Sequence, residues 1–480
     1  MVATGETVTR RVRYPHFVVA AVKSILNAVV YVLSGRRMLY LEGRYVRGRF
    51  VNWSHDRRHR AHWAEPTTED EVVEVIRRSS ALRVVGAGHS FNDGLATNGT
   101  TLSLDRLSGL VSVDVGSRRA TVWGGTRLRD LTRLLLAHGL AFRVMASHDA
   151  QSLAGVLATD VHGTGREPAH TSDLVLGLRI VDGTGTVHDV TPADDLFRAA
   201  VGGIGAVGVI TQVTVQCVDA FDVRTTSTVE TRRWAEQNLD LLLETHDHVS
   251  FYLYPFTDLL HVHTWDRTSA PRSPLGRQRE ALAEGVAAVS AAVGGDFLAH
   301  TGRLPDSAST GLRLQPAGNL VLRSHEAFSR SQYHLHQELE LALPAERVWV
   351  SADALLRLYE EMYRQAPLPF LLLELRFTPA AHDCSLLGAG TDRATAWLNL
   401  CVNQSGRVVD FFDAVESWVR TGQGARCHLG KWNETITHAD LARMHGSRMH
   451  RFQEVRAEAD PRGKFTNLFV ERLLGPVRDS

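Results

Sequence analysis

The chain has little of what marks several common protein classes. Its only four cysteines are Cys217, Cys384, Cys401 and Cys427, and none of them forms a C-x-x-C pair. This scarcity argues against zinc sites and against a disulfide framework, so we expect reduced thiols in a cytoplasmic protein. The chain also has no excess of positive or negative charge, because lysines plus arginines and aspartates plus glutamates both number 53. Without a basic surplus there is no footprint for nucleic acid, and a small-molecule substrate is favoured.

Histidines, by contrast, are numerous, with 23 in the chain. Two pairs alternate along the sequence, His261 with His263 and His334 with His336. Alternation without an evident cysteine or carboxylate cluster is weak support for a metal site. We therefore interpret both pairs as packed or surface histidines and predict no metal.

The N-terminal segment, residues 1–45, holds the longest apolar run. Residues 17–33 are apolar except for Lys23, Ser24 and Asn27, and arginines stand on both sides of the run. Seventeen residues are at the short limit for a spanning helix. No small-residue cleavage site follows, which argues against a signal peptide. Two interpretations stay open: a membrane-associated helix that makes a peripheral contact through residues 15–37, or a helix that covers an apolar groove.

A short apolar strand at 82–85 runs directly into Gly86-Ala87-Gly88-His89. Glycines at such a position allow a tight turn and close approach of the backbone, so that N–H groups can point at a diphosphate. A Rossmann fingerprint would need a third glycine at position 91, where the chain has Phe91. The loop therefore predicts a dinucleotide site that is not of the NAD type.

The surrounding sequence predicts alternating helices and strands. Thr68 and Glu71 have the spacing of a capping box and open a helix whose apolar stripe includes Val72, Val73 and Ile76. Further strands are expected over 101–104, 120–123, 174–181, 186–190 and 209–216, and helices over 126–138 and 194–200. Asp182-Gly183 predicts a hairpin turn between two of these strands.

A second glycine-rich stretch covers residues 151–165, where small residues suit a backbone packed against a flat ring system. Residues 203–208 match G-x-G-x-x-G literally, but a helix precedes them and a strand follows, the reverse of a Rossmann turn. We therefore reject that match as a nucleotide fingerprint. Residues 267–276 read as an exposed loop and residues 281–293 as an alanine-rich helix.

Both glycine-rich stretches resemble those of the vanillyl-alcohol-oxidase flavoprotein superfamily, in its aldonolactone oxidase and alditol oxidase branch. The run Gly86-Ala87-Gly88-His89-Ser90-Phe91-Asn92-Asp93 is similar to the pyrophosphate loop of that family, and the second stretch is similar to its S-x-A-G…A-T-x-x-H-G-[ST]-G run. The resemblance implies FAD, bound covalently through His89. The implied cofactor-binding residues are Gly86, Ala87, Gly88, His89, Ser90, Asn92, Ser152, Gly155, Gly163, Thr164, Gly165, Val209 and Ile210.

The resemblance also implies an α+β architecture in which a two-subdomain FAD-binding domain carries an α+β substrate cap domain. It is strong over 48–216 and patchy over 370–475. We expect the FAD-binding domain at 46–218, the cap at 219–455 and a C-terminal return to the FAD domain at 456–480. The return carries Asp460-Pro461-Arg462-Gly463-Lys464-Phe465, which is similar to the family's closing D-P-x-G-x-F segment.

Two cap motifs are the candidates for catalysis. Glu374 and Arg376 stand two apart in an apolar strand at 370–377 and share one face of it. Charges there are costly to bury unless they are paired or used, so a structural ion pair and a polar substrate floor are both open. They resemble the family's E-x-R pair, which faces the flavin.

The second cap motif is His428-Leu429-Gly430-Lys431, which is similar to the family's H-W-x-K. The likeness implies that Lys431 points its ammonium group at the flavin or the substrate oxygen, with His428 as a proton-accepting group nearby. Two positions depart from the family pattern: Asp160 stands where a glycine, threonine or alanine is usual, and Leu429 replaces a tryptophan.

The leading hypothesis is a covalent-FAD oxidoreductase that oxidises a carbinol group of a sugar-derived polyol or aldonolactone by hydride transfer to flavin N5. The electron acceptor is oxygen or an unidentified compound. One alternative is a flavoenzyme acting on a lipid-linked sugar or sterol-like substrate at a membrane. Residues 451–461 are similar to the tail of decaprenylphosphoryl-ribose oxidases. Another alternative is a flavin-binding protein without turnover.

Overall fold

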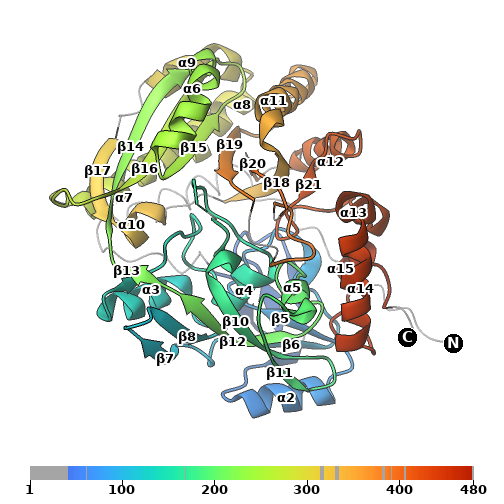
Figure 1. The fold of residues 1–480 in the computed structure, drawn as a ribbon. Helices are drawn as coiled ribbons and strands as arrows, with labels where there is room; N and C mark the ends of the chain where they lie inside the picture. The colour runs from blue at the N-terminus through green and yellow to red at the C-terminus, as the bar shows by residue number, and fades with distance from the viewer. Residues whose placement is uncertain are drawn as a thin grey trace.

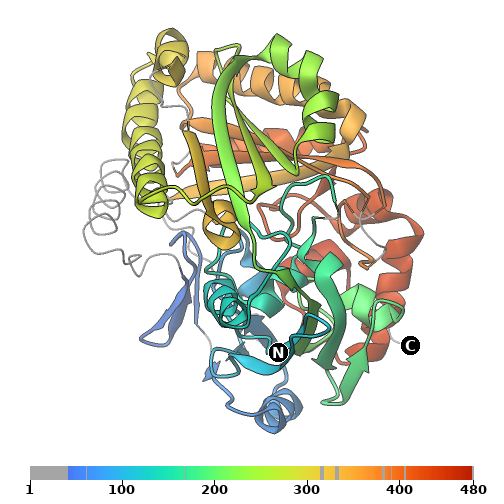
Figure 2. The ribbon, with the colours of Figure 1, turned by 60° about the vertical axis from the view of Figure 1, so that its left-hand side comes forward.

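The computed structural model describes residues 42–60, 62–167, 169–313, 318–329, 335–380, 384–390, 392–404 and 407–477. They form two units stacked on each other (Figures 1 and 2). The N-terminal unit comprises residues 42–219 and the C-terminal helices, and the cap unit comprises residues 222–427. Both units mix helices with sheets, which confirms the predicted α+β class.

The N-terminal unit contains three main sheets. One is antiparallel, with strands β1 (Arg44–Val46), β2 (Arg49–Val51) and β3 (Arg58–Arg60). A parallel sheet has the order β4 (His62–Ala64), β6 (Thr100–Ser103), β5 (Leu82–Val85). An antiparallel sheet has the order β11 (Val187–Val190), β10 (Val175–Val181), β12 (Val209–Gln216), β8 (Arg119–Trp123), β7 (Leu110–Asp114). A short pair joins β9 (Leu140–Ala141) to β13 (Val218–Asp219).

Short helices fill the connections of this unit: α2 (Glu69–Arg78), η2 (Asp93–Leu95), α3 (Leu128–Ala137), α4 (Leu153–Ala158), η3 (Thr171–Leu174) and α5 (Asp195–Ala200). The predicted cap of α2 is confirmed, because the Thr68 side chain accepts a hydrogen bond from the Glu71 N–H. The apolar stripe of α2 is buried, as its spacing predicts. The predicted hairpin is confirmed as well, since β10 and β11 pair antiparallel on either side of Asp182-Gly183.

One antiparallel sheet of eight strands forms the cap unit. Its order is β17 (Gly318–Arg323), β14 (Asp222–Thr231), β16 (Leu259–Thr268), β15 (His248–Leu253), β19 (Leu371–Thr378), β20 (Thr395–Asn403), β18 (His336–Pro344), β21 (Arg426–Cys427). Strand β19 confirms the strand predicted at 370–377. The central strands are almost wholly buried, because they lie between the N-terminal unit on one face and helices on the other.

The cap helices are α6 (Arg232–Thr245), α7 (Gly276–Val289), η4 (Ser290–Gly295), α8 (Asp296–His300), α9 (Leu304–Arg313), α10 (Ser324–Phe328), η5 (Ala345–Arg347), α11 (Val348–Gln365) and α12 (Val408–Val419). Helices α6, α9 and α11 lie on the side of the sheet away from the N-terminal unit (Figures 1 and 2). The alanine-rich helix expected at 281–293 begins earlier, at Gly276, and continues as the π-helical segment η4.

The chain returns to the N-terminal unit through α13 (His438–His445), α14 (Ser447–Ala459) and α15 (Leu468–Leu474). Helix α14 lies beside α5 (Figure 1), and Arg451 forms an ion pair with Asp195. The Asp460 carboxylate accepts hydrogen bonds from the N–H groups of Lys464 and Phe465. The Leu82 N–H donates to the Lys464 carbonyl. The return segment therefore fixes the start of β5, which leads into the glycine loop.

The apolar run at 17–33 and His334 lie outside the described residues. Within the described ranges, no helix has both the length and the apolar character needed to cross a membrane.

Candidate active site

A deep cleft lies between the two units and contains about 1680 Å³ of empty space, part of it open to solvent. Most of the residues predicted from sequence line it: Gly86, Ala87, Gly88, His89, Ser90, Asn92, Ser152, Gly155, Val209, Ile210, Arg376, His428 and Lys431.

Two positions of the glycine loop cannot readily carry a side chain. A Cβ atom on Gly86 would lie 2.2 Å from the Ser152 hydroxyl oxygen, and Gly88 has a φ of +66°. A side chain at either position would be excluded or strained. The loop lines the cleft, and beside it the buried side-chain amide oxygen of Gln151 has no hydrogen-bond donor among the described residues. A bare backbone with an unmet acceptor beside it fits the predicted FAD.

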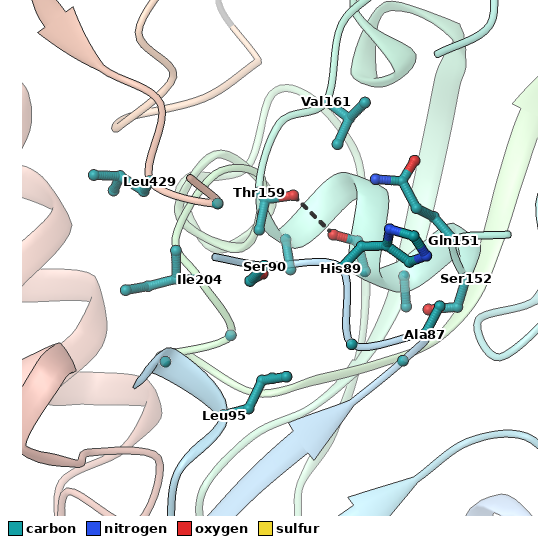
Figure 3. Close-up of a pocket in the computed structure, with 18 of the residues that line it drawn as sticks. Ala87, His89, Ser90, Leu95, Gln151, Ser152, Thr159, Val161, Ile204 and Leu429 are labelled. Atoms are coloured by element: carbon teal, nitrogen blue, oxygen red, sulfur yellow. Dashed lines mark hydrogen bonds between the residues drawn. The ribbon is translucent and has the colours of Figure 1, made fainter. Parts of the chain in front are cut away.

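His89 stands in the middle of this wall. In Figure 3, His89 and Ser90 lie between Gln151 and Ser152 on one side and Ile204 and Leu429 on the other. The His89 ring stacks on Trp53 with 5.1 Å between ring centroids and meets His148 edge-on at 4.1 Å. These neighbours hold the His89 ring in the cleft, where its position is compatible with the predicted bond to the flavin.

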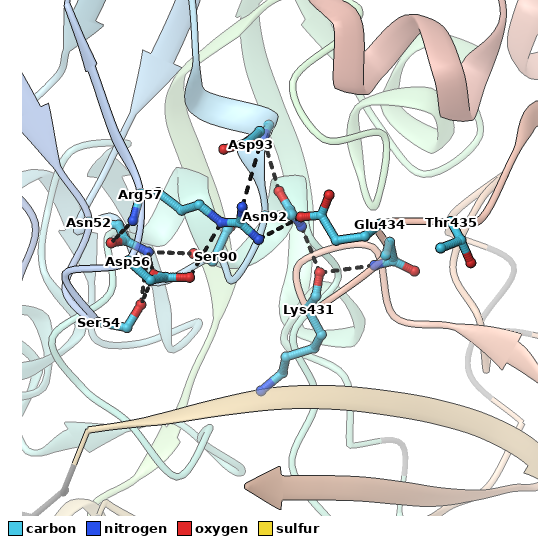
Figure 4. Close-up of polar contacts among 12 residues, drawn as sticks. Asn52, Ser54, Asp56, Arg57, Ser90, Asn92, Asp93, Lys431, Glu434 and Thr435 are labelled. Atoms are coloured by element: carbon cyan, nitrogen blue, oxygen red, sulfur yellow. Dashed lines mark hydrogen bonds and ion pairs between the residues drawn. The ribbon is translucent and has the colours of Figure 1, made fainter. Parts of the chain in front are cut away.

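Asn92 joins the glycine loop to the loop that carries Lys431. Its side-chain amide donates to the Leu429 carbonyl at 2.9 Å and to the Lys431 carbonyl at 2.7 Å, while its oxygen accepts from the Gly94 N–H. Figure 4 shows the hydrogen bond from Asn92 to the Lys431 backbone, from which the Lys431 side chain extends toward strand β18. Asn92 therefore fixes protein backbone with all three of these hydrogen bonds, although it was predicted as a cofactor ligand.

A second connection between the same loops involves Arg57. Its guanidinium forms ion pairs with Glu434 at 2.5 Å and with Asp93 at 3.5 Å. The central guanidinium carbon, Cζ, lies 5.3 Å from the centroid of the Trp432 ring. Arg57 and Glu434 are 377 residues apart in the sequence. Because Glu434 follows Lys431 by three residues, the ion pair helps to hold the lysine loop against the glycine loop (Figure 4).

Four charged side chains form the floor of the cleft, three from cap strands and Lys431 from the loop after β21. Lys431 donates to Glu338, and its Nζ lies 3.9 Å from Glu340. Arg376 donates to Glu340. All four side chains line the cleft, and β18 supplies both carboxylates.

Mutual pairing keeps these groups ionised. Burial would lower the pKa of Lys431, but the attraction of Glu338 and Glu340 outweighs it and raises that pKa. Burial would raise the pKa of Glu340, yet Arg376, His162 and Lys431 hold it well below its usual value. The cleft floor is therefore zwitterionic at neutral pH.

Two histidines complete the floor. His428 Nδ1 accepts a hydrogen bond from the Gly430 N–H, so in the neutral ring Nε2 carries the proton. Burial lowers the pKa of His428 to about 4. His162 has the opposite tautomer. Its Nδ1 faces the Gly163 carbonyl oxygen, which can only accept a hydrogen bond, so Nδ1 carries the proton in the neutral ring.

Several predicted site residues lie elsewhere. Among the described residues, Gly163, Thr164, Gly165 and Glu374 do not line the cleft. Thr164 donates to the carbonyls of Val249 and Phe377 in the cap, and the Gly165 N–H also bonds the Phe377 carbonyl. Thr164 and Gly165 therefore join the two units. Of the E-x-R pair, Arg376 reaches the cleft, and Glu374 lies 3.9 Å from its Nε.

Asp160, the departure in the second motif, also does not line the cleft. It is buried with a φ of +51°, accepts a hydrogen bond from Ser172 at 2.8 Å and lies 3.2 Å from His170. The acid is held by protein groups behind the cleft wall. Leu429 is buried and does line the cleft.

The residues that sequence reasoning missed are His162, Glu338 and Glu340. The signal for the two carboxylates was present, since His336, Glu338 and Glu340 alternate and so share one strand face. His162 stands inside the second motif but was passed over in favour of the glycines that follow it.

Among the residues that the structure describes, two groups of three donors lie close enough together to hold a metal ion: His162, Glu340 and His428, and His336, Glu338 and Cys401. The second group shows that His336 does have a carboxylate and a cysteine beside it, contrary to the sequence interpretation. Both carboxylates are already bonded to Lys431 or Arg376, which a divalent cation would have to displace. The absence of a metal stays a prediction.

Two family models match the chain. A model described as FAD binding domain matches residues 61–191, and a model described as D-arabinono-1,4-lactone oxidase matches residues 213–473. Together they cover the glycine loop, the second motif and the charged floor.

Similar proteins point the same way. L-gulono-1,4-lactone dehydrogenase of Mycobacterium tuberculosis is 30% identical over 425 residues, which span 86% of this chain and 95% of that protein. L-gulonolactone oxidase of Mus musculus is 26% identical over 85% of this chain and 94% of its own. Alditol oxidase of a Streptomyces species is 37% identical, over 33% of this chain and 39% of its own. A solved structure titled solvent-stable cholesterol oxidase superposes with a TM-score of 0.73 at 17% identity, covering 90% of this chain and 98% of its own.

Proposed function

Because the chain belongs to the D-arabinono-1,4-lactone oxidase family, an aldonolactone and alditol oxidase branch of FAD-dependent oxidoreductases, we propose that it oxidises a CH–OH group of an aldonolactone. The observation that carries the proposal is the charged floor opposite the glycine loop. As a member of the family, the chain is an FAD-dependent oxidoreductase that acts on sugar-derived alcohols, and FAD when bound supplies the two-electron acceptor.

Lys431 and Arg376 position the oxygen of the substrate. Both are cations held by carboxylates of β18, and both side chains reach the cleft. Negative charge that develops on an alcohol oxygen as it loses its proton would be stabilised by these prearranged donors. Glu338 and Glu340 in turn keep the two cations oriented.

A lactone is favoured over an open polyol by the extent of the similarity. The lactone dehydrogenase aligns with most of this chain, whereas the alditol oxidase aligns with a third of it. The likeness to cholesterol oxidases lies in the fold alone and does not support a sterol substrate.

Anaerobic bleaching of the bound flavin tests the substrate class. Aldonolactones should reduce the flavin faster than polyols of the same carbon number, and lipid-linked sugars should not reduce it. Reoxidation with air, compared with artificial dyes, then identifies the kind of acceptor. Bleaching by polyols alone would refute the lactone assignment, and a flavin that no candidate reduces would favour a binding protein without turnover.

The covalent bond to His89 is part of the proposal. It is supported by the position of the ring in the cleft wall and by the motif around it.

A peripheral membrane contact through residues 15–37 is also proposed, on the apolar run and its flanking arginines. The deletion that tests it should end at residue 41, because Glu42 pairs with Arg127 and Arg129, and the Gly43 N–H donates to the Ala87 carbonyl. The shortened protein should keep FAD and leave the membrane fraction. Unchanged fractionation would refute the contact.

A further inference from the structure

His162 presents an imidazole nitrogen without a proton to the floor of the cleft. Its ring stacks on Trp397 with centroids 3.6 Å apart and planes at 19°. Its Nδ1 lies 2.9 Å from the Gly163 carbonyl oxygen and must donate to it. The neutral ring therefore carries its lone pair on Nε2, in a fixed orientation.

That lone pair faces a carboxylate. His162 Nε2 is 3.4 Å from Glu340 Oε1, and each side chain is only 1% exposed. No donor among the described residues forms a hydrogen bond with Nε2. Two buried acceptors facing each other are costly unless a proton or a ligand donor comes between them.

The resting pair lacks that proton. Burial lowers the pKa of His162 to about 3, although Glu340 opposes the effect. Arg376, His162 and Lys431 together hold the pKa of Glu340 well below its usual value. The other titratable groups that face His162 are His170 on its own loop, Arg376 on β19 and His428 after β21. A proton delivered by a ligand would meet a vacant acceptor next to a negative charge.

We propose that His162 is the base of the reaction, with Glu340 as the group that stabilises its protonated form. The substrate O–H bond breaks and its proton moves to His162 Nε2. FAD, when bound, would supply the acceptor for the hydride from the adjacent C–H bond, so that a carbonyl forms. The imidazolium then lies against the Glu340 carboxylate, which removes the conflict between the two acceptors. The assignment rests on the proposed function.

The other candidates fit this step less well. His428 carries its proton on Nε2, as its hydrogen bond from Gly430 requires, and so it can donate to an oxygen but not take a proton there. Lys431 and Arg376 are kept charged by their carboxylates. Both can hold the oxygen while His162 removes the proton.

The substitution His162→Gln tests the assignment in enzyme loaded with FAD. The rate constant of anaerobic flavin reduction at saturating lactone should fall by about 100-fold or more, the usual contribution of general base catalysis. The residual rate should rise with pH, because hydroxide replaces the missing base. The dissociation constant of the substrate should change by less than about threefold, since a base acts chiefly in the transition state.

His445→Gln is the matched control. His445 is also buried, burial and nearby arginines lower its pKa to about 3, and it does not line the cleft. This variant should reduce its flavin at the normal rate at every pH. The double variant His162→Gln with Glu340→Gln should be no slower than the slower single variant, because residues that act as a unit are not additive. Additive losses would overturn the pairing.

A spectroscopic measurement remains informative if a variant folds poorly. In protein labelled with ¹⁵N-histidine, the resonance absent from His162→Gln belongs to His162. At neutral pH it should report an unprotonated Nε2, and it should move toward the protonated form after anaerobic reduction by lactone. An Nε2 that is protonated in the resting enzyme would refute the assignment. A normal rate in His162→Gln alongside a slow Lys431→Met would leave the proposed function intact and remove only this base.

Discussion

At the scale of single residues, Lys431 is the group whose charge matters most to the proposed chemistry. Replacing Lys431 with methionine keeps much of the length of the side chain and leaves Glu338 without its cation. The rate constant of flavin reduction should fall by about 100-fold or more, as the loss of one prearranged electrostatic group commonly does. Substrate affinity should change much less. Anaerobic stopped-flow measurement gives both quantities.

Lys431→Arg serves as the control, because it retains the positive charge and should recover part of the rate. Equal rates in Lys431→Met and the unmodified enzyme, with full FAD content in both, would mean that the ammonium group only pairs with Glu338.

His89 carries the second prediction at this scale. In His89→Ala the flavin should still bind, because many other residues of both glycine-rich stretches and of the cap also line the cleft. Acid precipitation should then release all the yellow colour from the variant and none from the unmodified protein. Complete release from both would exclude the covalent bond while leaving FAD binding intact.

Among the elements, the loop after β5 and the loop after β21 act as one unit through Asn92. Asn92→Asp replaces two donated hydrogen bonds with a carboxylate that faces two carbonyl oxygens. Each buried group left unsatisfied costs about 1–3 kcal/mol, so the variant should melt at a lower temperature. Displacement of the Lys431 loop should also slow flavin reduction more than it weakens substrate binding.

Asn319→Asp provides the comparison, because Asn319 is exposed on β17 and only accepts a 3.4 Å hydrogen bond from Arg224, which a carboxylate accepts as well, so neither property should change. If Asn92→Asp melts and reacts as the unmodified enzyme does, the two loops are not coupled through this side chain.

The elements also show where sequence reasoning succeeds. The glycine loop, α2 and the β10–β11 hairpin were predicted because caps, turns and glycine runs are local. Glu338 was missed because its partner Lys431 is 93 residues away, and only the antiparallel order of β20, β18 and β21 brings them together. Gly163 to Gly165 were assigned to the cofactor because the motif gives no direction for the chain, which here turns toward the cap.

At the scale of the whole molecule, the buried pair of Asp160 and His170 lies where the wall of the N-terminal unit meets the cap. Asp160 is bonded to Ser172, which in turn accepts a hydrogen bond from Cys384, and the His170 ring lies 5.6 Å from that of Trp397 on β20. The pair therefore links stability to pH across both units.

The last prediction concerns this pair. Burial would lower the pKa of His170, but Asp160 outweighs it and raises that pKa above the ordinary value of 6.5. A raised histidine pKa gives stability that is fully present below the unfolded pKa and is lost as the pH rises through the folded value. The pKa of Asp160 is lowered, because its partners outweigh burial, so its contribution is lost only in acid.

Asp160→Asn should consequently lower the melting temperature most between about pH 4 and 6.5, where both partners are charged in the unmodified protein. Breaking a buried pair costs about 3–5 kcal/mol, which is about 3–5 °C if the whole chain melts together. The difference should shrink as the pH rises from 6.5 to the raised pKa of folded His170, because the unfolded chain loses this proton first and the folded protein loses it last. Differential scanning calorimetry from pH 4 to pH 9 measures this trend. A difference that stays constant across that range would show that His170 is neutral in the folded protein and that Asp160 acts only through Ser172.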